Sequence, residues 1–247
     1  MKFILAQSTH NGKRITNEDY AAFKVTPSWT CLALADGLGG HMLGATAAQL
    51  IIDKIIDEAP LMANQINLNI TSGVAQLIAS AYLHYQKVIA DQYDNQDART
   101  TLAMCWINSQ SWCAAFIGDS RIYHLSPYQP LWRTLDHSLV QLWVLNQQLN
   151  ENKMSQHRLQ HVILNSINIY HPATPEINAH PTLQVGEGIL ICSDGLWENT
   201  SDLEINKLLT SPHPQTALDD LVQKAFESGG PYCDNITGLF IKRIDSL

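Results

Sequence analysis

Acidic residues stand at the ends of apolar, strand-like runs in five separate parts of this chain. They are Glu18 and Asp19 in TNEDY, Asp36 after CLALA, Asp119 after CAAFIG, Asp194 after GILICS, and Asp234 before NITGLFI. One such residue is more often a turn residue than a ligand, but five with the same placement are harder to assign to turns. If the strand ends converge, two carboxylates about 4 Å apart cost on the order of 4 kcal/mol. Several such pairs would exceed the stability of a typical domain, so the pattern predicts bound cations.

The chemistry of these residues points to a hard divalent cation. Oxygen ligands without cysteine or clustered histidine favour Mg²⁺ or Mn²⁺ over Zn²⁺. Two ions that share one carboxylate could polarise a water molecule and hold a phosphoryl oxygen. The glycines of ADGLGGH free the backbone after Asp36, so the Gly37 carbonyl can turn toward a metal. The structural alternative for this stretch is a strand-to-helix turn with an aspartate near the helix start.

A cation that could hold a phosphate lies close to the first acidic pair. Arg14 precedes Glu18 by four residues, in RITNED. A guanidinium group can hold phosphate through two parallel hydrogen bonds. A solvated surface arginine is the usual alternative, and only the position beside NED favours the phosphate role.

Composition and charge exclude several classes of function. The 247 residues are 45% hydrophobic and 15% charged, and 15 basic against 23 acidic residues give a formal charge of −8. No basic run occurs, which argues against nucleic-acid and membrane partners. The apolar run in MKFILAQSTH is too short for a signal peptide. Five cysteines without a CxxC pair indicate reduced core thiols. We therefore expect a cytoplasmic protein that is a monomer.

The elements that would position these residues alternate between blocks of strands and pairs of helices. The periodicity predicts strands over 14–25, 29–36, 100–109, 111–120, 121–126, 187–192 and 235–244, and helices over 44–58, 71–92, 201–210 and 215–227. Residues 136–168 read as irregular helical material rich in amide side chains. This order favours an α+β fold in a single domain spanning residues 1–247.

The acidic motifs also resemble a known family. The segments RITNED, ADGLGGH, RTTL, GDSR, DHS, SDGLWE and DNIT occur in this order between residues 14 and 237. Together they resemble the PPM (PP2C-type) metal-dependent protein serine/threonine phosphatases, in their stand-alone bacterial branch. The resemblance implies an α-β-β-α sandwich of two antiparallel sheets flanked by helix pairs. It also implies a flap-like segment within about 136–185.

The resemblance implies roles for individual residues. Asp36 would bridge two Mn²⁺ or Mg²⁺ ions, with the Gly37 carbonyl on one of them, and Asp194 and Asp234 would complete the other. The remaining roles fall to Glu18 and Asp19 (ligation directly or through water), Asp119 (a third, weaker metal shared with Asp194) and Arg14 (the substrate phosphate). A hydroxide between the two metals would attack phosphorus in line, without a phosphorylated enzyme.

Two departures from the family pattern concern the proton donor. Leu38 stands where many eukaryotic relatives carry a histidine proposed to protonate the leaving oxygen, which leucine cannot do. His41 matches the bacterial DGxGGH pattern instead, and it either donates a proton or has a structural role.

The substrates implied are phosphorylated proteins, and the enzyme would oppose a bacterial serine/threonine kinase, with a type VI secretion context as one setting. The alternatives are a hydrolase for small phosphoesters, a phosphoprotein-binding pseudophosphatase and a partner-switching regulator. The presence of Asp19, Asp36, Asp194 and Asp234 argues against the pseudophosphatase.

Overall fold

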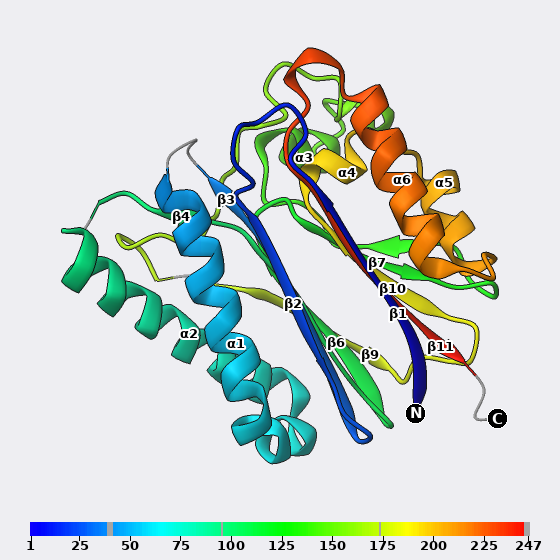
Figure 1. The fold of residues 1–247 in the computed structure, drawn as a ribbon, viewed down its shortest axis with the longest axis horizontal. Helices are drawn as coiled ribbons and strands as arrows, with labels where there is room; N and C mark the ends of the chain where they lie inside the picture. The colour runs from blue at the N-terminus through cyan, green and yellow to red at the C-terminus, as the bar shows by residue number, and fades with distance from the viewer. Residues whose placement is uncertain (39–41, 95, 173, 245–247) are drawn as a thin grey trace.

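The chain folds into four layers, with two antiparallel sheets in the middle and helices on both outer faces (Figure 1). The computed structural model describes residues 1–38, 42–94, 96–172 and 174–244. This arrangement confirms the predicted α+β sandwich.

Both sheets are built from antiparallel pairs throughout the described ranges. The first has the strand order β1 (Lys2–His10), β11 (Ile236–Ile244), β10 (Gly188–Cys192), β7 (Arg121–Leu125) and β8 (Trp132–Arg133). The second has the order β2 (Asp19–Val25), β3 (Trp29–Leu38), β5 (Leu102–Asn108), β6 (Ser111–Ile117) and β9 (Glu176–Pro181), and β4 (Arg99–Thr100) pairs with the end of β3.

Each sheet carries its own helices. The long helices α1 (Met42–Leu68) and α2 (Ile70–Tyr93) pack on the second sheet, and α6 (Pro214–Ser228) packs on β1 and β11 of the first. The shorter elements are α3 (Leu139–Leu145), α4 (Asp194–Trp197), α5 (Asp202–Asn206) and the 3-10 turns Glu151–Lys153, Lys207–Leu209 and Gly230–Tyr232. A capping box of Ser201 and Glu204 starts α5, as the sequence predicts.

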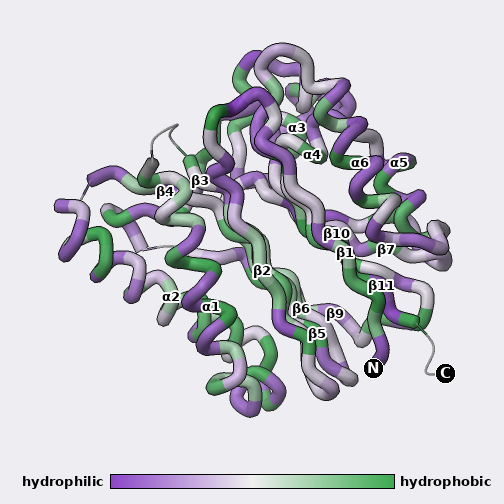
Figure 2. The backbone as a smooth tube through the Cα atoms, in the orientation of Figure 1, coloured by the Kyte–Doolittle hydropathy of each residue, from purple (hydrophilic) through white to green (hydrophobic). Residues whose placement is uncertain are grey.

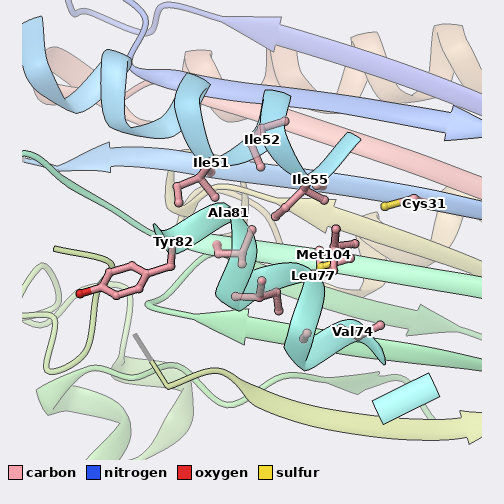
Figure 3. Packing of buried hydrophobic residues seen from close by; sticks show 14 of the residues in the cluster. Cys31, Ile51, Ile52, Ile55, Val74, Leu77, Ala81, Tyr82 and Met104 are labelled. Carbon is pink, nitrogen blue, oxygen red and sulfur yellow. The ribbon is translucent and has the colours of Figure 1, made fainter. Parts of the chain in front are cut away.

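Alternating side chains divide the core between the layers. On β3, Leu32 and Leu34 face the other sheet, whereas Cys31 and its alternating neighbours face the helices. Figure 3 shows Ile51, Ile52 and Ile55 of α1 packed against Leu77 of α2 and Met104 of β5. Apolar residues run along the strands and recur along α1 and α2 (Figure 2). The five cysteines are all buried and free, as expected.

Several element boundaries differ from the sequence prediction. Residues 14–18, predicted as the start of a strand, belong to a loop over residues 11–18, and β2 begins only at Asp19. Helix α1 continues past Pro60 to Leu68 because its apolar face continues, with Ala63 and Ile66 buried. Strands β1 and β9 were not predicted, and β9 lies inside the expected flap, so the part of that segment outside the sheets ends before Glu176. None of the helices within the described ranges combines the length and apolar character that crossing a bilayer requires.

Candidate metal centre

A cavity of about 570 Å³ opens at the end of the sandwich where the loop after β1 meets the segment leading into β11 (Figure 1). The predicted residues that line it are Arg14, Glu18, Asp36, Gly37, Asp119, Asp194 and Asp234. They come from parts of the chain that are up to 220 residues apart. The structure therefore brings the separately predicted carboxylates to one place.

Asp19 and Asp36 lie side by side because they are register partners on β2 and β3. The Ser193 hydroxyl donates a hydrogen bond of 2.7 Å to Asp19 Oδ2, which links this pair to the start of α4. Burial raises the pKa of Asp19 to about 6. The pKa of Asp36 is raised well above its ordinary value by burial and then by the charge of Asp19.

Close backbone packing explains the glycine after Asp36. A Cβ atom on Gly37 would lie 2.3 Å from the carbonyl carbon of Gly44 in α1, so a larger residue cannot occupy this position without moving the helix. The Gly37 N–H donates to the Glu18 carbonyl at 3.2 Å. Residues 18, 37 and 44 are thus held together at the cavity wall.

Asn235 fastens the loop that carries Arg14 and Glu18. Its side chain is buried, and its Nδ2 donates to the carbonyls of Asn11 at 2.9 Å and Thr16 at 3.0 Å. Its Oδ1 accepts from the Glu18 N–H at 2.8 Å. Asn235 is part of the DNIT segment, but its role in holding this loop was not predicted from the sequence.

A further carboxylate, not predicted from the sequence, interacts with Asp194 and Asp119. This residue is Glu198, which follows Asp194 by four positions and accepts a hydrogen bond of 3.0 Å from Gln160 Nε2. Burial raises the pKa of Asp119 to about 7 and that of Glu198 to about 8. Burial, followed by the charge of Glu198, also raises the pKa of Asp194 well above its ordinary value. Its place in SDGLWE, one helical turn after Asp194, was the signal that could have identified it.

Unpaired buried oxygens test whether this site fits a cation. The Oδ1 atoms of Asp19, Asp119 and Asp194 are buried and have no hydrogen-bond partner among the described residues. Such groups are costly unless a ligand satisfies them, and an all-oxygen set suits a hard divalent ion. The donor chemistry therefore fits Mg²⁺ or Mn²⁺.

The carboxylates share the cavity without forming a closed ligand set. Within the described ranges, no three His, Cys, Asp or Glu side chains are arranged as ligands of one ion. Asp234 Oδ2 instead accepts a hydrogen bond of 2.7 Å from Arg14 Nη2, and this bond raises the Arg14 pKa. Asp234 is thus held by Arg14 in this arrangement, and the predicted carboxylates are not yet in the geometry of joint ligation.

Two predicted positions bear on the proton donor. His41 lies outside the described residues. Leu38, at the end of β3, lines the cavity. An apolar side chain thus lies at the position where the resemblance places a histidine in many eukaryotic relatives.

The comparison that decides the family covers most of the sequence. The sequence model of the protein phosphatase 2C family matches residues 6–231. The chain belongs to the protein phosphatase 2C family.

Bacterial members of the phosphatase 2C family are similar along nearly the whole chain. Protein phosphatase PhpP of Streptococcus pneumoniae is 30% identical over 231 residues, which are 91% of each protein. Serine/threonine protein phosphatase PstP of Mycobacterium tuberculosis is 28% identical over 97% of this chain, but the match spans only 45% of PstP.

Solved structures show the same fold. A crystal structure of PstP superimposes with a TM-score of 0.85 at 26% identity, covering 98% of this chain and 99% of that one. A structure of the PstP catalytic domain in complex with two manganese ions has a TM-score of 0.79 at 25% identity, over 98% and 99% of the two chains. PppA of Pseudomonas aeruginosa, a regulatory component of type VI secretion, shares the fold at 24% identity, with a TM-score of 0.72 over 98% of each chain.

Proposed function

We propose that this member of the phosphatase 2C family is a Mn²⁺- or Mg²⁺-dependent protein serine/threonine phosphatase, with residues 1–247 as a single catalytic domain. The observation that carries the proposal is the set of buried, unpaired carboxylate oxygens at a cavity that also contains Arg14. PstP and PhpP are serine/threonine and protein phosphatases by name, and the PstP catalytic domain holds two manganese ions.

The acidic residues divide into two groups of proposed ligands. Asp36, the Gly37 carbonyl, Asp194 and Asp234 would hold two ions, with Glu18 and Asp19 ligating directly or through water. Asp119 and Asp194 would hold a third, weaker ion, and Glu198 adds negative charge beside them. Bound divalent ions supply a hydroxide nucleophile near neutral pH and stabilise charge on the phosphoryl group. The Asp19–Ser193 hydrogen bond fixes the position of this acidic group relative to α4.

Arg14 would bind the substrate phosphate. Its guanidinium is about half exposed, lines the cavity and already binds a carboxylate oxygen of Asp234. A phosphate dianion offers the same kind of acceptor oxygen, so substrate can take the place of Asp234 on Arg14. This exchange would leave Asp234 available to the metal site.

The substrates would be phosphoproteins, and the enzyme would oppose a serine/threonine kinase in the cytoplasm. A type VI secretion context stays a prediction, because PppA shares only the fold at its level of identity. The absence of a nucleic-acid or membrane partner and the monomeric state also stay predictions.

Phosphate release from p-nitrophenyl phosphate and a phosphothreonine peptide tests the proposal. Purified protein is assayed in EDTA, Mg²⁺ or Mn²⁺, together with Asp36→Asn, Asp194→Asn and Asp91→Asn, an exposed control on α2. We expect metal-dependent hydrolysis that falls by at least about 10³-fold in the first two variants and is retained in Asp91→Asn. Folded wild type that binds Mn²⁺ but hydrolyses neither compound would instead support the phosphoprotein-binding alternative.

A further inference from the structure

Apolar side chains are part of the lining of the acidic cavity. Ile15 lines it and is 98% exposed, although isoleucine is among the residues most often buried. Ile163, from the segment between β8 and β9, and Leu38 line the same cavity. A metal site for small anions alone gives no reason for these exposed apolar residues.

The loop that presents Ile15 is fixed on both sides of this residue. Asn235 Nδ2 binds the carbonyls of Asn11 and Thr16, and the Lys13 N–H donates to the Cys233 carbonyl at 2.8 Å. The exposed side chain is therefore held by a restrained backbone. An apolar group that is positioned before binding loses little entropy when a ligand covers it.

Ile163 is held in place by residues 137 and 138. It forms an isolated bridge with Ser138, and the next residue, Leu164, donates its N–H to the His137 carbonyl at 2.7 Å. Two restrained segments, far apart in sequence, thus place one isoleucine each on the lining of the same cavity.

The charges in the cavity lining determine how a phosphopeptide would be oriented in it. Lys13 and Arg14 precede Ile15 in the chain and line the same cavity, so two cations accompany Ile15 there. A phosphoryl group belongs beside these cations and the carboxylate cluster. Ile15 and Ile163 can then contact the part of the ligand next to the phosphorylated residue.

Resting on the proposed function, we propose that Ile15 and Ile163 form an apolar clamp for the side chain adjacent to the phosphorylated serine or threonine. Preferred substrates are then phosphopeptide segments with leucine, isoleucine, valine, methionine or phenylalanine beside the phosphoresidue. Contact with such a side chain removes apolar surface from water on both partners, whereas a polar side chain there loses hydration without a new partner.

The test uses two phosphothreonine peptides that differ only in the residues flanking phosphothreonine, leucine in one and glutamine in the other. The measured quantity is the ratio of their kcat/KM values with Mn²⁺. Each variant's rate on p-nitrophenyl phosphate is measured in parallel as a check on its metal site. We expect wild type to prefer the leucine peptide about fivefold, the scale of partial burial of one apolar side chain. The preference should fall below about twofold in Ile15→Ala and in Ile163→Ala.

Leu68→Ala is the matched control, because Leu68 is also apolar and is 89% exposed at the end of α1 remote from Gly37 and Gly44. It should keep the wild-type ratio. Ile15→Lys, which adds a third cation beside Lys13 and Arg14, should shift the preference toward a glutamate-flanked peptide.

Equal hydrolysis of the leucine and glutamine peptides by wild type would overturn the clamp and leave the phosphatase proposal intact. Retention of the fivefold preference in both alanine variants would do the same. Failure of the Mn²⁺-loaded protein to hydrolyse either peptide or p-nitrophenyl phosphate would overturn both proposals together.

Discussion

Asp119 and Asp136 are both buried, and Asp119 lines the cavity, but their carboxylates differ in hydrogen-bond partners. Asp136 accepts hydrogen bonds from Arg121 Nε at 2.8 Å and Nη2 at 2.7 Å. Asp119 Oδ1 has no hydrogen-bond partner within the part of the chain that the structure describes. Burial and then the charge of Asp136 raise the Asp119 pKa. Neighbouring carboxylates of the same type thus have opposite environments.

The difference separates a structural carboxylate from one available to a ligand. The Arg121 guanidinium also lies 3.4 Å from the Trp197 ring centre, and Trp197 Nε1 donates to the Asp119 carbonyl at 2.9 Å. The satisfied Arg121–Asp136 pair therefore supports the backbone that presents the unsatisfied Asp119. We therefore predict that Asp136 contributes to stability in this region and that Asp119 is the carboxylate that binds a cation.

Asp136→Asn is expected to have the largest effect on stability. It leaves the buried Arg121 without its counter-charge, which costs about 3–5 kcal/mol of unfolding free energy. Urea unfolding followed by tryptophan fluorescence measures this loss. A change below about 1 kcal/mol would show that Trp197 and Tyr123, whose hydroxyl accepts a hydrogen bond of 3.1 Å from Arg121 Nη1, are sufficient partners for Arg121.

Asp119→Asn should change stability in the opposite direction. Removing an unpaired buried charge at pH 8 in EDTA should raise the unfolding free energy by on the order of 1–2 kcal/mol. In saturating Mn²⁺ the gain should shrink, because the wild type then acquires a stabilising ligand that the variant binds less well. Destabilisation of Asp119→Asn in EDTA would contradict the proposed contrast with Asp136.

The pH dependence of stability gives the most specific difference. Asp119 and Glu198, with pKa values raised by burial to about 7 and about 8, bind protons in the folded state that the unfolded chain has released. Their contribution to stability is complete below the ordinary carboxylate pKa and is lost as pH rises through these values.

In EDTA, the unfolding free energy should therefore fall as pH rises from about 4 to about 8 and level off above, with a slope of up to roughly 1.4 kcal/mol per pH unit for each proton that only the folded state holds. Glu198→Gln should flatten this slope, and so should Mn²⁺, because bound cations favour the ionised carboxylates. A slope that is the same in Glu198→Gln and in wild type would exclude Glu198 as a source of the effect.

The layers of the fold and most carboxylates of the site could be predicted from local sequence patterns. The continuous apolar runs of β3 and β10 and the apolar stripes of α1 and α2 are properties of short windows, and so is an aspartate that follows an apolar run. The resemblance to the family then joined the windows into one site.

What could not be predicted depends on partners that are distant in the sequence. Residues 14–18 form a loop whose backbone is bound at Thr16 and Glu18 by Asn235, more than 200 residues away. Glu198 becomes part of the acidic cluster only because the short helix α4 turns it back toward Asp194 and Asp119. The ion pair between Arg14 and Asp234 likewise has no local signal.

The bonds of Asn235 also bear on when the protein can become active during its synthesis. Glu18 and its loop leave the ribosome early, but the side chain that fixes them is added 217 residues later. At a few residues per second or faster, translation leaves this interval as a period of many seconds in which the nascent chain lacks both the fixed loop and Asp234. Under the proposed function, activity would therefore arise only late in synthesis, after Asp234 and Asn235 have been added.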